Sequence, residues 1–288
     1  MSTPTNTAGG AERRGSRQGR RTPRGAVPWG ALAVLAAVAL AALLPGFAAP
    51  ESPFAEDVSR RLLPPSAEHL FGTDELGRDL FSRVVHGART TLATALLALG
   101  SALGLSLLIG VLAGYLGGLV DRALMAVVDV LLALPSLLIS LLVVFALGAG
   151  PVNLAVAVGI ASVPTFARVT RAEVLRVGSH SFVEAARGYG LPLRLILFRH
   201  VLPHARGPIT ALSALELATI VLSVSALSFL GYGARPPDPE WGNLIAEGRS
   251  HFMTAWWLTA LPGAVLVCVV LALHRVGRLL GSREAVAV

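Results

Sequence analysis

Lysine is absent from this chain of 288 residues, so all 24 of its basic residues are arginine. The absence excludes a Walker A phosphate loop, because that loop needs a lysine to reach the nucleotide phosphates. An ATP-driven process would therefore need its ATPase on another polypeptide. Cysteine is nearly absent as well, and the single Cys268 has no partner for a disulfide within the chain.

Charge is scarce too, since 14% of the residues are charged and 54% are hydrophobic, with a mean hydropathy of +0.68. A soluble domain usually has about 25% charged residues. Apolar stretches that can hold a spanning helix of about 20 residues recur along the chain. They lie between residues 24 and 51, 89 and 121, 129 and 168, 206 and 235, and 250 and 274.

The third stretch is long enough for two spans and is broken by a turn signal at residues 148–151. We therefore expect an all-α membrane protein with six transmembrane helices. The segments expected are a disordered basic tail over 1–25, a first transmembrane helix over 26–49, an extracytoplasmic loop over 50–89, a five-helix core over 90–280 with a cytoplasmic loop over 176–206, and a C-terminal tail over 281–288.

Arginines near span ends predict the orientation, because basic residues stay on the cytoplasmic side. With the N-terminus inside, 17 arginines are cytoplasmic and 7 are outside, where ten acidic residues also lie. Both termini and the loop 176–206 are therefore predicted to be cytoplasmic. A twin-arginine signal is an alternative for the N-terminal segment, although a basic tail before a first span has the same pattern.

The loop 176–206 is cationic and has the pattern of short helices. Ser181 and Glu184 form a capping box that predicts a helix start, and Gly188 and Gly190 are suited to its end. A second helix is expected over 192–200. The residues alone leave two interpretations open: an amphipathic loop on anionic lipid, or a docking element for a soluble partner.

This loop resembles the EAA loop of ATP-binding-cassette (ABC) importer permeases, whose coupling helix fits a cleft in the partner ATPase. Further segments resemble the peptide/nickel permease group, and specifically the second permease of dipeptide and oligopeptide importers. They are Phe71-Gly72-Thr73-Asp74-Glu75-Leu76-Gly77-Arg78-Asp79, Gly87-Ala88-Arg89, Leu227-Ser228-Phe229-Leu230-Gly231 and Pro236-Pro237-Asp238-Pro239-Glu240-Trp241-Gly242. The resemblance covers roughly residues 28–275 and implies a type I ABC importer permease fold.

The resemblance also implies functional residues. Those expected to couple to the ATPase are Glu184, Ala185, Ala186, Arg187, Gly190, His200 and Pro203. Those of the extracytoplasmic motif are Gly72, Thr73, Asp74, Gly77, Arg78, Asp79, Pro237, Glu240 and Trp241.

The same resemblance implies the partners and the place of the protein. It implies a homologous second permease in a heterodimer, two cytoplasmic ATPases that bind ATP and Mg, and an extracytoplasmic binding protein. Membrane lipid surrounds the chain, and nucleic acid is not among the partners. The implied location is the bacterial plasma (inner) membrane, and the implied cargo is a short peptide, with nickel or another small solute as the alternative.

The extracytoplasmic segments have local signals of their own. Asp74 is a suitable N-cap for an amphipathic helix over 75–86. For Arg78 and Asp79 two interpretations stay open: they pair with each other or with groups in the partner permease, or they are solvated charges on an interfacial anchor. The prolines of residues 236–239 predict a rigid elbow before a short helix. The expected membrane-interface anchors are Trp241, Trp256 and Trp257.

Two acids fall inside predicted spans, where an ionised carboxylate costs about 3 kcal/mol. For Glu216 we consider a role in lining the pathway or in a structural pair. For Asp129 we consider a pair with Arg122.

Catalysis by this chain is not expected. His200 and His204 are four residues apart, but Pro203 lies between them and no H-E-x-x-H motif is present, so no metal site is predicted. A G-x-S-x-G elbow is absent as well. The rival interpretations are a secondary transporter driven by an ion gradient, which would need buried ionisable groups in paired repeats, and a membrane scaffold without transport.

Overall fold

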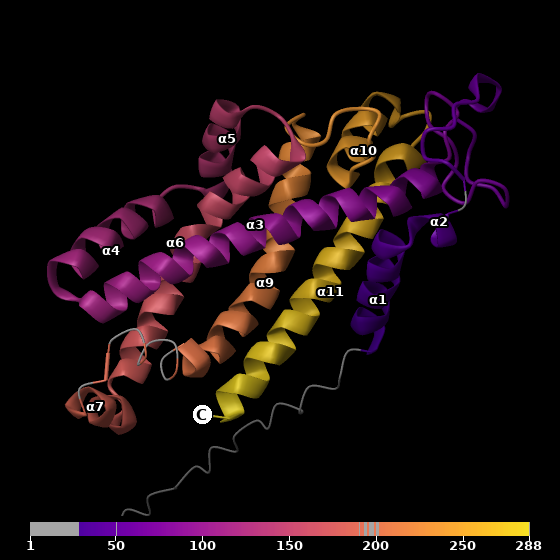
Figure 1. Ribbon diagram of the computed structural model, residues 1–288. Helices are drawn as coiled ribbons and strands as arrows, with labels where there is room; N and C mark the ends of the chain where they lie inside the picture. The colour runs from indigo at the N-terminus through magenta and orange to yellow at the C-terminus, as the bar shows by residue number, and fades with distance from the viewer. Residues whose placement is uncertain are drawn as a thin grey trace, which may run out of the picture.

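The computed structural model describes residues 29–49, 51–189, 191–192, 195, 199 and 202–287, and its regular elements are helices, while residues 51–79 lie mostly in turns and loops (Figure 1). The tail 1–25, predicted to be disordered, lies outside the described residues. The α-helices are α1 Trp29–Leu43, α2 Pro45–Ala48, α3 Leu80–Leu116, α4 Gly118–Leu132, α5 Ser136–Leu147, α6 Pro151–Gly178, α7 Ser181–Gly188, α9 Leu202–Phe229, α10 Trp241–Glu247 and α11 Trp257–Ala287. Two 3-10 turns, η1 Val58–Arg60 and η3 Gly248–His251, join them.

The helix predicted over 75–86 begins later than expected. The long helix α3 starts at Leu80, and its N-cap is Asp79, whose carboxylate accepts from the backbone N–H of Ser82 at 2.7 Å. The expectation that Asp74 caps this helix is wrong, because Asp74 instead closes the turn over residues 74–78. The outer helix and the second span are thus one continuous helix of 37 residues.

The predicted break at residues 148–151 is confirmed, since α5 ends before Gly148 and α6 begins at Pro151. Gly148 and Gly150 have φ angles of 88° and 147°, which suit glycine. A second break was not expected: α4 and α5 are bent by 97° at their junction. Proline at position 135 directly precedes α5 and cannot continue α4.

Among the described residues, four helices are long and apolar enough to cross a membrane, namely α3, α6, α9 and α11, and the bent pair α4 and α5 makes a fifth candidate. The sixth expected span falls on α1, whose 15 residues rise about 22 Å. This is shorter than the hydrocarbon core of about 30 Å. The all-helical membrane architecture is confirmed, and the count of six spans stays a prediction.

Small residues allow the central helices to approach closely. A Cβ on Gly110 of α3 would lie 2.6 Å from the Thr170 side chain of α6, and a Cβ on Gly159 would lie 1.9 Å from Ser101 Oγ. The main apolar core joins α3, α5, α6, α9, α10 and α11, with members such as Leu154. The pair of α3 and α6 therefore forms the packed centre of the fold.

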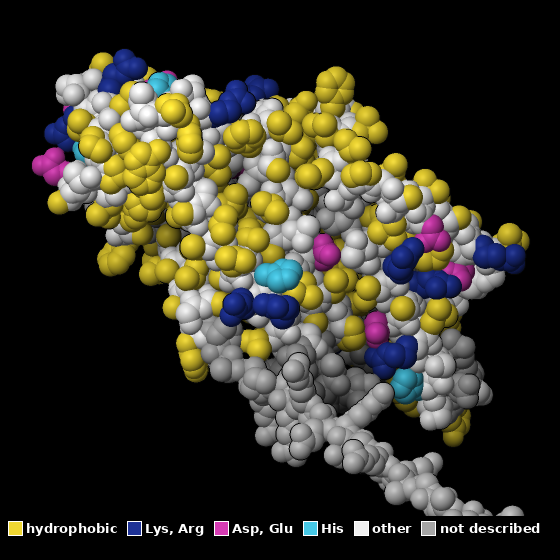
Figure 2. Space-filling model, turned by 180° about the vertical axis from the view of Figure 1, so that it is seen from behind, with side chains coloured by type: hydrophobic (Ala, Val, Ile, Leu, Met, Phe, Trp, Pro, Cys, Tyr) yellow, Lys and Arg dark blue, Asp and Glu magenta, His cyan; other side chains and the backbone are white. Residues whose placement is uncertain are grey.

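The molecule has two ends (Figure 1). We call the end that carries α10 and residues 51–79 the α10 end, and the opposite end, where α7 lies, the α7 end. In Figure 1 α1 runs toward the α10 end, whereas α11 runs toward the α7 end. Figure 2 shows charged side chains gathered toward both ends of one face, with mostly hydrophobic side chains between them. This pattern is typical of a protein embedded in a bilayer.

Candidate functional site

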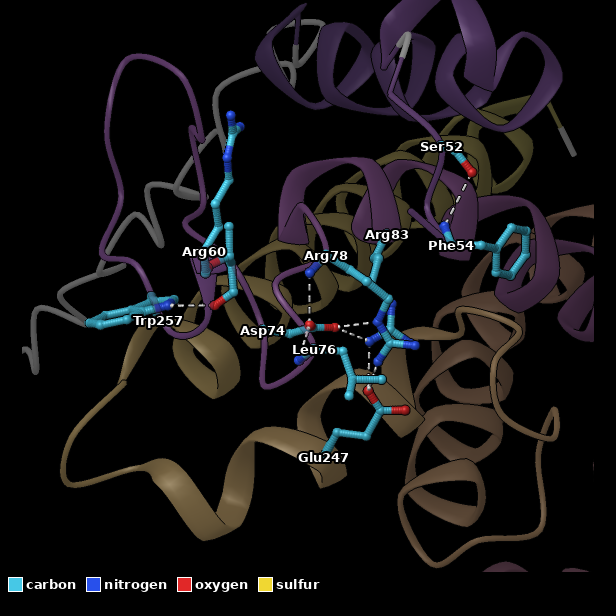
Figure 3. A network of polar contacts seen from close by, with 10 residues as sticks. Ser52, Phe54, Arg60, Asp74, Leu76, Arg78, Arg83, Glu247 and Trp257 are labelled. Carbon is cyan, nitrogen blue, oxygen red and sulfur yellow. Dashed lines mark hydrogen bonds and ion pairs between the residues drawn. The ribbon is translucent and has the colours of Figure 1, made fainter. Parts of the chain in front are cut away.

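The α10 end holds a buried ionic network around Asp74 (Figure 3). The Asp74 carboxylate accepts from the backbone N–H groups of Leu76 at 2.9 Å and Arg78 at 3.0 Å. It also accepts from Arg78 Nε and from Arg83 Nη1, both at 2.7 Å. Arg83 Nη1 reaches Glu247 of α10 as well, at 2.8 Å. The expected pair of Arg78 with the neighbouring carboxylate at 79 is therefore wrong, since Arg78 binds Asp74.

This network fixes residues that are far apart in the sequence. Arg83 and Glu247 are separated by 164 positions, and the Arg83 side chain is only 1% exposed. Two buried arginines beside two carboxylates keep the charge balanced, which a buried ion needs. The network therefore ties the turn before α3 to α10.

Glycine and threonine shape the turn that holds Asp74. Gly72 and Gly77 have φ angles of 77° and 75°, and a Cβ on Gly77 would lie 1.8 Å from the carbonyl oxygen of Asp57. Thr73 Oγ1 accepts from the backbone N–H of Leu63 at 2.8 Å and donates to the carbonyl of Arg60. The motif inferred from resemblance thus has a structural explanation at each of these three positions.

Asp79 has two partners. Its Oδ2 caps α3, and its Oδ1 lies 3.0 Å from Nδ1 of the buried His69. Within the described residues, Glu51, His69 and Asp79 are the one group whose ligand atoms lie within 4.8 Å of one another. Nδ1 of His69 and Oδ1 of Asp79 are bonded to each other, whereas the buried Nε2 of His69 has no hydrogen-bond partner among the described residues.

Glu240 closes the elbow between α9 and α10. Its buried carboxylate accepts from Ser228 Oγ at 2.7 Å and from the backbone N–H of Ala234 at 2.6 Å. Burial raises the pKa of Glu240 above its ordinary value, against the lowering effect of these two hydrogen bonds. Pro237 lies exposed in the elbow itself. The short helix predicted after the elbow is confirmed as α10.

The expected interface role is wrong for two of the three tryptophans. Trp241 is fully buried, and its indole N–H donates to the carbonyl of Val84 at 2.9 Å. Trp257 is also buried, and its Nε1 lies 3.4 Å from the carbonyl of Thr73. Trp256 is 53% exposed, as an interface anchor requires. The sequence pattern did not distinguish these three, because their burial depends on segments far away in the chain.

At the α7 end, the predicted short helix is confirmed as α7, and Glu184, Ala185, Ala186 and Arg187 lie in it. Gly190 and His200 lie outside the described residues, as does most of the helix predicted over 192–200. Pro203 is exposed near the start of α9. Val183 is buried against Val174 and Val177 of α6, so one apolar side chain anchors α7 to the core.

Ion pairs join α4 to α6 near this end. Asp129 pairs with Arg168 of α6 at 2.5 Å, so the expected pair with Arg122 is wrong. A second pair, which the sequence analysis missed, joins Asp121 to Arg171. Asp121 and Arg171 are 50 residues apart in the chain, so no local sequence pattern indicates that they meet. Glu216 lies half-buried in α9.

Solved structures define the class of the fold. A chain of the MetNI methionine ABC transporter in an inward-facing conformation is similar with a TM-score of 0.57 and 20% identity, over 70% of this chain and 97% of that one. A chain of an amino acid ABC transporter with histidines is similar with a TM-score of 0.54 and 16% identity, over 70% of this chain and 94% of that one. The fold is that of an ABC transporter permease.

The family follows from the sequence comparisons. Residues 106–284 match the family model of the binding-protein-dependent transport system inner membrane component. The di/tripeptide transport system permease protein of Pseudomonas aeruginosa is 37% identical over 265 residues, 89% of this chain and 86% of the relative. The glutathione transport system permease protein of Shigella flexneri is 43% identical over 221 residues, 77% of this chain and 72% of the relative.

The dipeptide transport system permease protein of Alkalihalophilus pseudofirmus is 36% identical over 227 residues, 79% of this chain and 74% of the relative. The chain belongs to the binding-protein-dependent transport system inner membrane component family, and it is a multi-pass permease subunit of an inner membrane ABC transporter. Nucleotide binding in such a transporter belongs to the ATPase partners.

Proposed function

We propose that this chain is one half of the translocation pathway of an ATP-driven importer for short peptides, which an extracytoplasmic binding protein delivers. The observation that carries the proposal is the similarity to permeases named for dipeptides, di/tripeptides and glutathione over three quarters or more of the chain. A homologous second permease supplies the other half, and two cytoplasmic ATPases complete the complex.

In this proposal α7 is the coupling helix, with Glu184, Ala185, Ala186 and Arg187, and the loop residues Gly190, His200 and Pro203 support its contact with an ATPase. Two observations support this role. The helix has the predicted bounds, and it lies at one extremity of the molecule (Figure 1). ATP-driven closure of the ATPases would then displace α7 and switch the membrane pair between outward and inward openings.

The orientation belongs to the same proposal. The α7 end faces the cytoplasm, and the arginine bias toward this side supports that assignment. Both termini are then cytoplasmic, and the direction of α1 and α11 in Figure 1 agrees with this placement. The buried network around Asp74 and the elbow at Pro237 lie outside, where they hold the scaffold that receives the binding protein.

Copurification tests the assembly. The tagged chain, expressed with its neighbouring transport genes, is expected to bring down a second permease and an ATP-hydrolysing subunit. Glu184→Ala and Gly190→Ala should weaken ATPase association and abolish uptake, whereas Glu56→Gln, an exposed position at the opposite end and outside both the Asp74 network and the elbow, should leave both unchanged. A pure complex without ATPase activity would contradict the proposal.

Uptake assays identify the cargo. Membrane vesicles or cells that carry the complete system should take up a labelled dipeptide or glutathione in an ATP-dependent manner, and unlabelled peptide should compete. ATP-dependent uptake of Ni²⁺ without competition by peptide would replace the peptide assignment by nickel. Uptake driven by an ion gradient alone would favour a secondary transporter.

We further propose that Glu216 lines the pathway, because an acid that is half-buried within a spanning helix favours a water-filled cavity or a partner. Glu216→Gln should lower uptake while the complex still assembles. Unchanged uptake and assembly would remove this role. For Asp129, the ion pair with Arg168 supports pairing.

A further inference from the structure

Helix α4 is bounded by a break on each side. Gly117 precedes it with a φ angle of 63°, its first residue, Gly118, has a φ angle of 55°, and the 97° bend separates it from α5. Among the residues of α4, Val128 is the buried one, and it packs with Val163 and Ala167 of α6. Met125 of α4 and Ile109 of α3 pack against the same small cluster, so few buried apolar side chains hold α4 in place.

Ion pairs add to the sparse apolar packing between α4 and α6. Arg171 of α6 binds Asp121 of α4 through two parallel bonds, with Nε 2.5 Å from Oδ1 and Nη2 2.6 Å from Oδ2. Such a fork fixes the orientation of two groups as well as their distance. The second pair, Arg168 with Asp129, has a single bond at 2.5 Å, and its side chains are 58% and 60% exposed. The Asp121–Arg171 pair is therefore the stronger attachment of α4 to α6.

Helix α6 is connected directly to α7. Only residues 179–180 separate the two helices, and Val183 of α7 is buried against Val174 and Val177 of α6. The close approach of Gly114 and Val174, where an added Cβ would lie 3.0 Å from the valine side chain, packs α6 against α3 over the same stretch. A displacement of α7 is therefore passed to α6 rather than absorbed between them.

We propose that the Asp121–Arg171 pair is the clamp that carries a displacement of α7 through α6 into α4. The inference rests on the proposed function, in which α7 contacts an ATPase. Both residues are positioning residues, since they act through the helices that they join. Without the clamp, α6 and α7 move while α4 stays behind between its two breaks, so ATP is hydrolysed without the matching transport step.

The test uses the complete transporter in proteoliposomes and measures peptide uptake per ATP hydrolysed. Arg171→Ala and Asp121→Ala should each lower this ratio about ten-fold, within the range of about 5- to 150-fold typical of coupling between sites. The exchanged double variant Asp121→Arg with Arg171→Asp should recover most of the ratio. Arg171→Lys should give an intermediate ratio, because it keeps the charge and loses the fork.

A matched control lies on the same helix. Glu173 pairs with Arg176 at 2.7 Å, and both belong to α6. Glu173→Gln removes an ion pair that bridges no helices, so the ratio should not change. An equal loss in this variant would attribute the effect to the general charge of α6 and would overturn the clamp.

Other outcomes overturn the inference as well. An unchanged ratio in Arg171→Ala would do so, as would a loss of complex that the exchanged variant does not recover, since that is the signature of a purely structural role. If the complex with Arg171→Ala does not assemble, Arg171→Lys is the deciding variant. An unchanged ratio of uptake to ATP hydrolysis in Arg171→Lys counts against the clamp. Failure of the wild type to show ATP-dependent uptake would instead refute the proposed function.

Discussion

The two ends of this permease are built differently. At the α10 end, Asp74, Arg83 and Glu240 are buried, and Arg83 and Glu240 bond to residues 164 and 12 positions away in the chain. At the α7 end, the ion pair of Asp129 and Arg168 is largely exposed, and α7 itself is anchored through Val183. A buried ionic network resists rearrangement because breaking a buried pair is costly, whereas an exposed pair such as Asp129 with Arg168 is exchanged at little cost. The α10 end is thus the fixed scaffold, and the α7 end is the part suited to movement.

The largest effect is expected from Arg83→Ala at the α10 end. The change leaves Asp74 and Glu247 without the guanidinium that joins them, and breaking a buried pair costs about 3 to 5 kcal/mol. We expect a loss near the lower value, because Glu247 is 34% exposed. Thermal unfolding of the purified wild type and variant in detergent measures this loss of stability.

The control for Arg83 is Arg60→Ala, which removes a pair that is about half exposed. It should change stability much less than Arg83→Ala does. Equal losses in both variants would show that burial of the network does not stabilise the α10 end.

Gly77→Ala should cost about 2 kcal/mol, within the range for a strained backbone position. Its φ of 75° disfavours a side chain, and the added Cβ would overlap the backbone of Asp57. Gly117→Ala at the other end is the matched control, because its φ is 63° but no atom lies within 4 Å of the added Cβ. The difference in unfolding free energy between the two variants isolates the steric part, and a difference of zero would contradict the packing described for the α10 end.

The raised pKa of Glu240 predicts that the stability of the folded protein depends on pH. Because burial raises its pKa in the folded state, its protonated form is favoured there, and its contribution to stability is lost as pH rises from the ordinary value of 4.5 through the raised one. Glu240→Gln should flatten this part of the stability curve. Unfolding of both proteins measured from pH 4.5 to 7.5 tests the sign, and identical slopes would rule out a titrating Glu240.

The smallest effect is expected from Asp129→Asn. An exposed ion pair contributes about 0.2 to 1 kcal/mol, so the free energy of unfolding should fall by less than about 1 kcal/mol. The same thermal unfolding assay applies. A loss comparable to that of Arg83→Ala would erase the contrast between the two ends.

The sequence predicted helix ends correctly where residues close together in the chain determine them. The break at 148–151, the bounds of α7 from Ser181 to Gly188 and the short helix after the elbow all follow from proline, glycine and capping residues. The start of α3 was misplaced, because Asp74 and Asp79 are both acceptable N-caps in sequence. Two arginines and the turn at Gly77 engage Asp74, which leaves Asp79 to cap the helix.

The sequence by itself determined the class of this protein: its apolar stretches require a membrane, its lack of lysine excludes a phosphate loop, and its motifs identify a permease. These properties depend on residue type and on neighbours along the chain. Only the tertiary structure decided the partner of each buried polar group, including Arg83 with Glu247, Trp241 with the Val84 carbonyl, and Arg171 with Asp121. These contacts join residues 50 to 164 positions apart, so their partners are chosen by helix packing and not by any local pattern.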